Sequence, residues 1–290
     1  MKPAPTCRGP AKNRWTGTPP GVASVPWRRQ PPDAPRVTLF LSDLHLGRGT
    51  PAATRAAERD AMALLRAHES DLLGPDGTLV LLGDVFDQFI EYRHLVPKSG
   101  ARLVGLLADW ADRGARILYV VGNRDLWHVD YFEREIGLTV LRDGATVRLD
   151  GHRTYIAHGD RETPGTGLAG RLSLRFQPLL RAPAMARLYR TSLPGDAGFA
   201  LARWVAYRFG SDGAPEPDAT AALAQAAQER LRTTDAEVVA HGHVHEAVCT
   251  LGRDGAYLNP GYWFGDRTFG RLTPDGPTLF RWVNGRALPL

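Results

Sequence analysis

The hydrophobic residues of this chain gather in short unbroken runs that stop abruptly at polar residues. Five such runs cover residues 37–41, 78–82, 117–121, 155–157 and 237–240. Short continuous apolar runs bounded by turns are typical of strands that are buried on both faces. Residues 55–68 and 99–113, which lie between strand runs, are predicted to be helices. The pattern therefore predicts an α/β domain.

Each run ends at residues that commonly bind divalent metal ions. In chain order these candidates are Asp43, His45, Asp84, Asn123, His158, His243 and His245. Side chains at strand ends converge on one edge of the sheets, where open α/β architectures place their sites. Two ions about 3.5–4 Å apart need about four ligands each, and a shared carboxylate commonly bridges them. Seven side chains, with Asp84 counted twice, supply eight contacts, so the sequence predicts a two-metal hydrolase site.

A single Asp or His at a strand end is more often a turn former or a core residue than a ligand. The joint occurrence of all the blocks favours the metal site over that interpretation. Mixed carboxylate, amide and imidazole ligands without thiolate suit Mn²⁺, Fe, Zn²⁺ or Co²⁺ and exclude an iron–sulfur cluster. Asp87, Asp125 and Asp160 are expected to orient ligands or backbone. The remaining histidines are interpreted as structural or surface residues: His68, His94, His128, His152 and His241.

The blocks DLH, GDVFD, GNRD, HGD and GHVH resemble those of the calcineurin-like metallophosphoesterases, in the same order. The resemblance implies a four-layer αββα sandwich of two mixed sheets with an inserted helical lid. It also implies two divalent ions, with Mn²⁺ favoured, that activate a water and stabilise the developing charge. By this resemblance one ion is held by Asp43, His45, Asp84 and His245. The other is held by Asp84, Asn123, His158 and His243, with Asp84 as the bridge.

Within this family the chain resembles the branch of the UDP-2,3-diacylglucosamine diphosphatases of lipid A synthesis. The shared features are Arg124 after Asn123, Phe86 and Phe89 after Asp84, and a long Arg-rich insert before the GHVH block. One stretch departs from the branch: RETPGTG follows the HGD block, where the branch usually has a Cys-Thr-Asp-Asp-like run.

Arg124 bears on the leaving group. Many members of the family have a His at this position that protonates an alkoxide, whereas an arginine stays charged and donates no proton in this way. A phosphate monoester, with a second pKa of about 6, leaves without that help. Arg124 can bind phosphate oxygens through two parallel hydrogen bonds. With Asp84 and Arg124 as catalytic residues, the expected reaction is cleavage of UDP-2,3-diacylglucosamine to UMP and 2,3-diacylglucosamine 1-phosphate.

Two other functions remain open at this point. A nuclease or another phosphodiesterase of the same fold would agree with the basic composition, although its alcohol leaving group suits Arg124 poorly. A metal-free binding protein of this fold, as in retromer, usually lacks ligand residues, whereas all seven are present here.

Composition agrees with an enzyme of the cytoplasm. The chain has 290 residues and 43% hydrophobic residues, enough for a sizeable core. We find no apolar run of the roughly 18–20 residues that span a membrane, and no signal-peptide pattern at the N-terminus. Residues 1–36 hold seven Lys or Arg and nine of the 22 prolines. We therefore expect a disordered basic arm at 1–35, either a solvated leader or a contact for an anionic partner, before a metallophosphoesterase domain at 36–290.

The insert at 161–212 contains eight arginines and three acidic residues. Its apolar residues recur at helical spacing, with a break at Ser192-Leu193-Pro194-Gly195, which predicts two or three amphipathic helices. The resemblance favours a lid over the metal site; the alternative is an ordinary helical hairpin packed on the core. As a lid, it would use Arg171 and Arg175, together with Arg124, to bind a lipid-linked nucleotide. It would also touch the cytoplasmic face of the inner membrane. No nucleic-acid partner is expected.

Overall fold

The computed structural model describes residues 37–163, 179, 181–209 and 217–290. The predicted basic arm lies outside these residues, as do two of the predicted substrate-binding arginines, Arg171 and Arg175. None of the helices in the described residues combines the length and apolarity needed to span a bilayer.

The larger sheet has seven strands in the order β12-β11-β10-β1-β2-β3-β4. Its parallel part consists of β1 (Thr38–Leu41), β2 (Thr78–Leu81), β3 (Arg116–Val120) and β4 (Thr139–Leu141). Its antiparallel part consists of β10 (Thr268–Thr273), β11 (Gly276–Val283) and β12 (Arg286–Pro289). The register pairs Leu41 with Leu81 and Leu81 with Tyr119, so the loops after β1, β2 and β3 leave the sheet at one edge.

The smaller sheet has five strands in the order β5-β6-β7-β9-β8. These are β5 (Ala145–Leu149), β6 (His152–Ile156), β7 (Val238–Ala240), β8 (Ala247–Leu251) and β9 (Ala256–Pro260). The pairs β6·β7 and β7·β9 are parallel, and β5·β6 and β8·β9 are antiparallel. Both sheets are therefore mixed, as predicted.

Alternation of side chains along the central strands produces the layers. Leu39 and Leu41 of β1 pack into the core beneath helices α1 (Pro51–Ala67) and α3 (Ala101–Asp112). Phe40, between them, packs into a second core with residues of the smaller sheet such as Ile156 and Leu258. Because successive side chains of a strand point to opposite faces, an all-apolar strand requires apolar partners on both sides.

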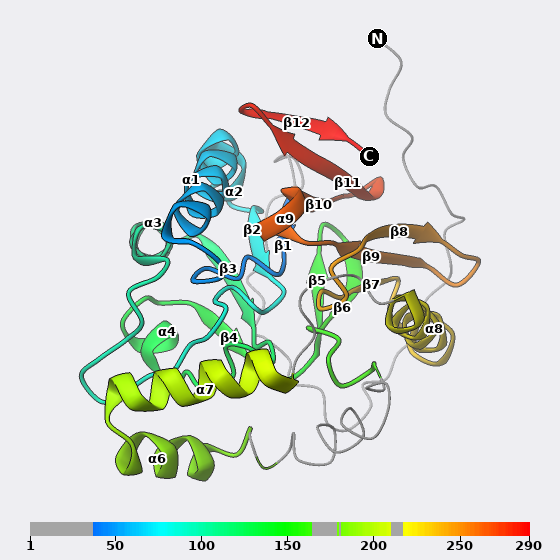
Figure 1. Ribbon diagram of the computed structural model, residues 1–290. Helices are drawn as coiled ribbons and strands as arrows, with labels where there is room; N and C mark the ends of the chain where they lie inside the picture. Colours follow the sequence, from blue (N-terminus) through cyan, green and yellow to red (C-terminus); the bar gives the residue numbers. More distant parts are fainter. Residues whose placement is uncertain (1–36, 164–178, 180, 210–216) are drawn as a thin grey trace.

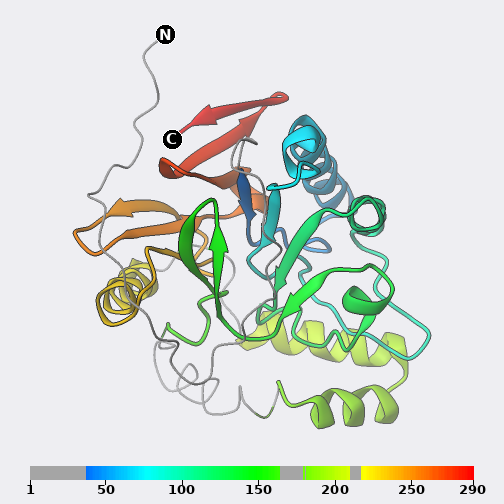
Figure 2. The same cartoon turned by 180° about the vertical axis from the view of Figure 1, so that it is seen from behind.

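Helix α8 (Pro217–Thr233) closes the fourth layer. Its Leu223, Ala227 and Leu231 pack with Val239 and Tyr257 against the outer face of the smaller sheet. Figures 1 and 2 show α1 and α3 on one side of the paired sheets and α8 on the other. The predicted four-layer αββα architecture is confirmed.

The predicted helices 55–68 and 99–113 correspond to α1 and α3. α1 begins where Thr50 accepts a hydrogen bond from the Ala53 N–H and Pro51 occupies the first turn. α3 begins where the buried carboxylate of Glu58 accepts the backbone N–H groups of Arg102 and Leu103. The short helices of the described residues are α2 (Glu69–Leu72), α4 (Tyr131–Arg134) and α9 (Trp263–Asp266).

The described part of the insert forms a helical hairpin of α6 (Pro183–Ser192) and α7 (Gly195–Phe209). The chain turns between them at Leu193 and Pro194, where the sequence predicts a break. Figure 1 shows the pair running side by side across one end of the molecule. Tyr189 of α6 packs its ring 4.4 Å from that of Trp127, which joins the hairpin to the loop after β3.

Candidate metal centre

The seven predicted ligands all lie in loops at the edge where both sheets end. Five of the eight described non-glycine residues with positive φ belong to this set: Asp43, His45, Asp84, His243 and His245. Left-handed backbone in such residues costs on the order of 1–3 kcal/mol each and concentrates at functional sites. Strain gathered on these residues is therefore independent evidence that the loops are shaped for a function.

Three of these side chains form the first candidate site. Asp43, His45 and His245 are all buried and could together hold an ion. His45 Nε2 lies 3.1 Å from His245 Nε2, and Asp43 Oδ1 lies 3.5 and 3.2 Å from the two nitrogens. An ion about 2 Å from each atom fits this triangle, and that is the usual metal–nitrogen and metal–oxygen distance. Among the described residues, buried Asp43 Oδ1 has no hydrogen-bond partner.

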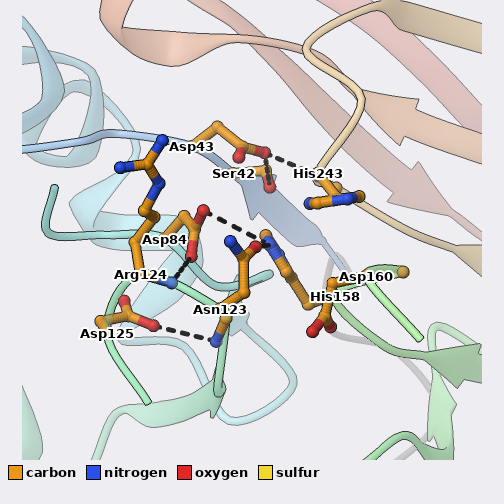
Figure 3. Close-up of polar contacts among 12 residues, drawn as sticks. Ser42, Asp43, Asp84, Asn123, Arg124, Asp125, His158, Asp160 and His243 are labelled. Atoms are coloured by element: carbon orange, nitrogen blue, oxygen red, sulfur yellow. Dashed lines mark hydrogen bonds and ion pairs between the residues drawn. The ribbon is translucent and has the colours of Figure 1, made fainter. Parts of the chain in front are cut away.

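The second candidate site forms around His158. Its Nδ1 donates to Leu82 O at 2.7 Å, which directs Nε2 towards Asn123 Oδ1 at 3.1 Å and Asp84 Oδ2 at 3.5 Å. Figure 3 shows these side chains pointing toward one another. Asp43, Asp84 and His158 form the second group able to hold an ion. The ring of His243 lies 5.1 Å from that of His158 and borders the same space.

The candidate ligands are buried and shift one another's pKa values. Burial opposes ionisation of Asp84, but His158 and His45 hold its pKa below the ordinary value. Burial disfavours the charged form of His158 as well, yet the Asp84 and Asp43 carboxylates raise its pKa to about 10. Burial lowers the pKa of His243 to about 4, leaving a neutral imidazole. Once an ion displaces the proton of His158, these carboxylates and imidazoles form a donor set that fits divalent transition ions.

The two groups meet at the carboxylates. Asp43 belongs to both of them. Asp84 Oδ2 also faces both, at 3.9 Å from His45 Nε2 and 3.5 Å from His158 Nε2, while Asp84 Oδ1 accepts the Arg124 backbone N–H at 2.8 Å. The structure thus contains two adjacent candidate metal sites within one buried cluster. That Asp84 is the bridging ligand stays a proposal.

Two glycines allow the carboxylates to lie against the backbone. A Cβ at Gly122 would lie 2.1 Å from Asp84 Oδ1, and one at Gly242 would lie 1.9 Å from Ser42 Oγ and 3.0 Å from Asp43 Oδ2. The glycines in the GNRD and GHVH blocks are therefore steric requirements of the candidate ligands.

Asp125 joins the loops that carry Asp84 and Asn123. Its Oδ1 accepts the Gly122 N–H at 2.9 Å, and its Oδ2 accepts the Val85 N–H at 2.8 Å and the Tyr119 hydroxyl at 2.5 Å. Burial and the nearby Asp84 charge raise the pKa of Asp125 to about 6. The geometry is that of an orienting group.

Asp87 lies beside the first site. Its Oδ1 accepts from Arg48 Nε at 2.8 Å and lies 3.6 Å from His45 Nδ1. Arg48 also donates to the Tyr262 hydroxyl at 3.2 Å, and the Tyr262 ring stacks on His245 at 4.3 Å. Arg48 and Tyr262 thus support two candidate ligands. Sequence reasoning did not find either, since their contacts are set by the fold.

Asp160 and the non-ligand His241 face the insert and α8. Asp160 accepts a hydrogen bond at 2.6 Å from Arg181, which lies just before α6. His241 Nε2 lies 2.7 Å from Glu162, which also accepts from Arg230 of α8 at 2.9 Å. These contacts anchor the loops after β6 and β7.

Arg124 is buried, with 7% of its surface exposed. Its backbone N–H donates to Asp84, and its side chain extends alongside that of Asp84 (Figure 3). Its guanidinium carbon lies 5.8 Å from the ring centroid of Tyr207 on α7. A fixed positive charge therefore borders the candidate metal centre.

Comparison with known proteins finds similar sequences and similar folds. No protein-family model matches the chain. A protein of Ralstonia nicotianae named UDP-2,3-diacylglucosamine hydrolase is 30% identical over 224 residues, covering 71% of this chain and 76% of its own length. Proteins of the same name from Xanthomonas axonopodis pv. citri (29% identity; 83% of this chain, 97% of its own) and Porphyromonas gingivalis (38% identity; 42% and 45%) are also similar.

Among solved structures, an archaeal phosphodiesterase has a TM-score of 0.43 at 14% identity and covers 88% of this chain and 99% of its own. Yfce, a phosphoesterase from E. coli, has a TM-score of 0.42 at 17% identity and covers 87% and 96%.

The α/β fold with two mixed sheets, together with a buried Asp and His cluster at the strand ends, defines a metal-dependent phosphoesterase. The predicted resemblance is confirmed. The chain belongs to the metallophosphoesterase family that includes the UDP-2,3-diacylglucosamine hydrolases.

Proposed function

We propose that the protein hydrolyses the diphosphate bond of UDP-2,3-diacylglucosamine, giving UMP and 2,3-diacylglucosamine 1-phosphate for lipid A synthesis. The observation that carries this proposal is Arg124, an arginine held at the centre by its backbone bond to Asp84. The names of the relatives support the same substrate.

The residues would divide the work as follows. One ion would be held by Asp43, His45, Asp84 and His245, and the other by Asp84, Asn123, His158 and His243. Bound Mn²⁺ or a similar ion would supply an activated water and stabilise charge on the phosphoryl oxygens.

Arg124 would bind the oxygens of the phosphate that departs. Its positive charge stabilises the departing group without transferring a proton, which suits a phosphate and not an alcohol. Asp125 holds Gly122 and Val85 in place and so keeps the Asp84 and Asn123 loops together.

The lid would bind the acyl part and touch the membrane surface. The α6–α7 hairpin exposes apolar side chains, among them Leu188 and Trp204 at 59% each. Exposed arginines, including Arg187 and Arg208, lie on the same two helices. Apolar side chains among basic residues favour contact with an anionic lipid surface.

The decisive experiment measures UMP release from UDP-2,3-diacylglucosamine with Mn²⁺, beside bis-p-nitrophenyl phosphate as a generic diester. Wild type is expected to release UMP, and an Asp84→Ala variant is not. Cleavage of the diester alone would replace the proposed substrate with another phosphoester, leaving the metal centre in place.

The Arg124→His variant tests the leaving-group argument separately. If Arg124 acts on the departing phosphate, this variant loses most diphosphatase activity and keeps or gains diester activity, since His can protonate an alkoxide. Full diphosphatase activity in the variant would contradict the role given to Arg124.

A further inference from the structure

Helix α7 contacts the edge of the metal centre through Tyr207. The Tyr207 hydroxyl donates to Asp87 Oδ2 at 2.6 Å. The other oxygen of Asp87 accepts from Arg48 and lies 3.6 Å from His45 Nδ1. One hydrogen bond therefore connects the helical hairpin to a carboxylate beside a candidate metal ligand.

The ring of Tyr207 lies near two arginines that come from different parts of the chain. The guanidinium carbon of Arg124, in the loop after β3, is 5.8 Å from the ring centroid. That of Arg203, one turn earlier on α7, is 5.6 Å from the same centroid. Both distances fall within the range of about 6 Å for cation–π attraction. Two positively charged groups thus lie near the same aromatic ring at the edge of the centre. A bound anion would offset their mutual repulsion.

We propose that Tyr207 is a positioning residue that fastens α7 to the metal centre and brings Arg203 beside Arg124 as a second phosphate-binding arginine. Arg124 would bind one phosphate of a diphosphate and Arg203 the other. The diphosphate part of this inference rests on the proposed function; the contact of Tyr207 with Asp87 does not.

Tyr189 offers a matched control on the same hairpin. Its hydroxyl donates to Gly198 O at 2.7 Å, and its ring packs on Trp127. This contact joins α6 to the start of α7, at the opposite end of α7 from Tyr207. A Tyr189→Phe variant therefore removes one hydroxyl bond from the hairpin without touching Asp87 or either arginine.

The first test compares KM and kcat for UDP-2,3-diacylglucosamine and for bis-p-nitrophenyl phosphate, which has one phosphate. Loss of a hydrogen bond to a charged group changes an equilibrium constant about tenfold or more. Tyr207→Phe and Arg203→Gln should raise KM for the diphosphate about tenfold, with kcat and the diester changed less than twofold. Arg55→Gln, at an exposed arginine of α1 outside the helical hairpin, should behave as wild type. Equal losses on both substrates, or wild-type kinetics of both variants, would overturn the proposal.

The second test needs no substrate. Hydrogen–deuterium exchange of the last two turns of α7 should be about tenfold faster in Tyr207→Phe than in wild type, with unchanged Mn²⁺ affinity by calorimetry. In Tyr189→Phe the faster exchange should be confined to α6 and the start of α7. Unchanged exchange near residue 207 would refute the fastening role. If wild type fails to cleave the lipid nucleotide, the proposed function fails while this exchange test still decides the role of Tyr207.

Discussion

Replacing Gly122 by alanine tests whether the position of Asp84 determines metal binding. The new Cβ would lie 2.1 Å from Asp84 Oδ1, 2.4 Å from its backbone nitrogen and 2.9 Å from its Cγ. The Asp84 nitrogen belongs to the backbone, so the new Cβ cannot be accommodated by a side-chain rotation alone. Relief requires a displacement of about 1 Å, which would also break the bond from Arg124 N to Asp84.

The magnitude follows from these distances. Overpacking a well-packed site costs about 1–3 kcal/mol of folding stability, which a domain of this size can survive. Misplacing a catalytic group by about 1 Å costs on the order of 10²-fold in rate. We therefore expect Gly122→Ala to fold, to unfold a few degrees earlier, and to lose about 100-fold in activity together with much of its Mn²⁺ affinity.

Gly105 provides the control. It lies in α3, and nothing is within 4 Å of where its Cβ would be. Gly105→Ala should raise stability by about 0.5–1 kcal/mol, because alanine is the better helix former, and should leave activity unchanged. Both variants are assayed by calorimetry with Mn²⁺, thermal unfolding followed by circular dichroism, and turnover. Wild-type Mn²⁺ affinity and turnover in a folded Gly122→Ala protein would refute the reasoning.

Three further predictions concern protons and metal. Burial lowers the pKa of His128 to about 3, so between pH 6.5 and pH 3 the unfolded chain binds this proton and the folded chain does not. Wild type should therefore lose stability between pH 7 and pH 5, and His128→Phe should remove about 2 kcal/mol of that loss, as measured by urea titrations at the two pH values. An equal loss of stability in the variant would contradict this. Because the pKa of His158 is raised to about 10, Mn²⁺ binding at pH 8 should release about one proton, and calorimetry in buffers of different ionisation enthalpy would show no buffer dependence if this is wrong. Free Mn²⁺ at 100 times its Kd should stabilise the fold by about 2.7 kcal/mol relative to chelator, and Asp84→Ala should respond much less.

The sequence predicts the parts of this protein that depend on local pattern. Apolar runs mark β1, β2, β3, β6 and β7, because strands buried on both faces need apolar residues at every position. The break before Gly195 falls between α6 and α7 for the same local reason. Helix α8 was not predicted, although Leu223, Ala227 and Leu231 recur every four residues. Its abundant alanines make a weak contrast between the buried and exposed faces.

The rest depends on contacts between distant segments. Arg48 and Tyr262 support His45 and His245, but the two residues lie 214 positions apart. Tyr207 meets Asp87 across 120 positions. The hydrophobic periodicity of the sequence does not predict such pairs, because the packing of the sheets and of the hairpin brings them together. The left-handed backbone of the five candidate ligands is equally hidden, because Asp and His are also common in ordinary turns.

The candidate metal centre joins the two sheets, and its geometry therefore depends on how they pack. Asp43, Asp84 and Asn123 follow strands of the larger sheet, whereas His158 and His243 follow strands of the smaller one. Hydrogen bonds cross between them, among them His158 Nδ1 to Leu82 O at 2.7 Å and His243 N to Asp43 Oδ2 at 2.9 Å.

The apolar core between the sheets sets the distance that these bonds span. Phe40 and Leu258 are fully buried in that core, are not themselves candidate ligands, and hold the sheets apart. Because close-packed interiors transmit small changes in volume as displacement, a smaller residue at position 40 would bring the sheets together. It would thus alter the spacing between the Asp and His ligands. The residues that tune the centre therefore include core positions that contribute no ligand.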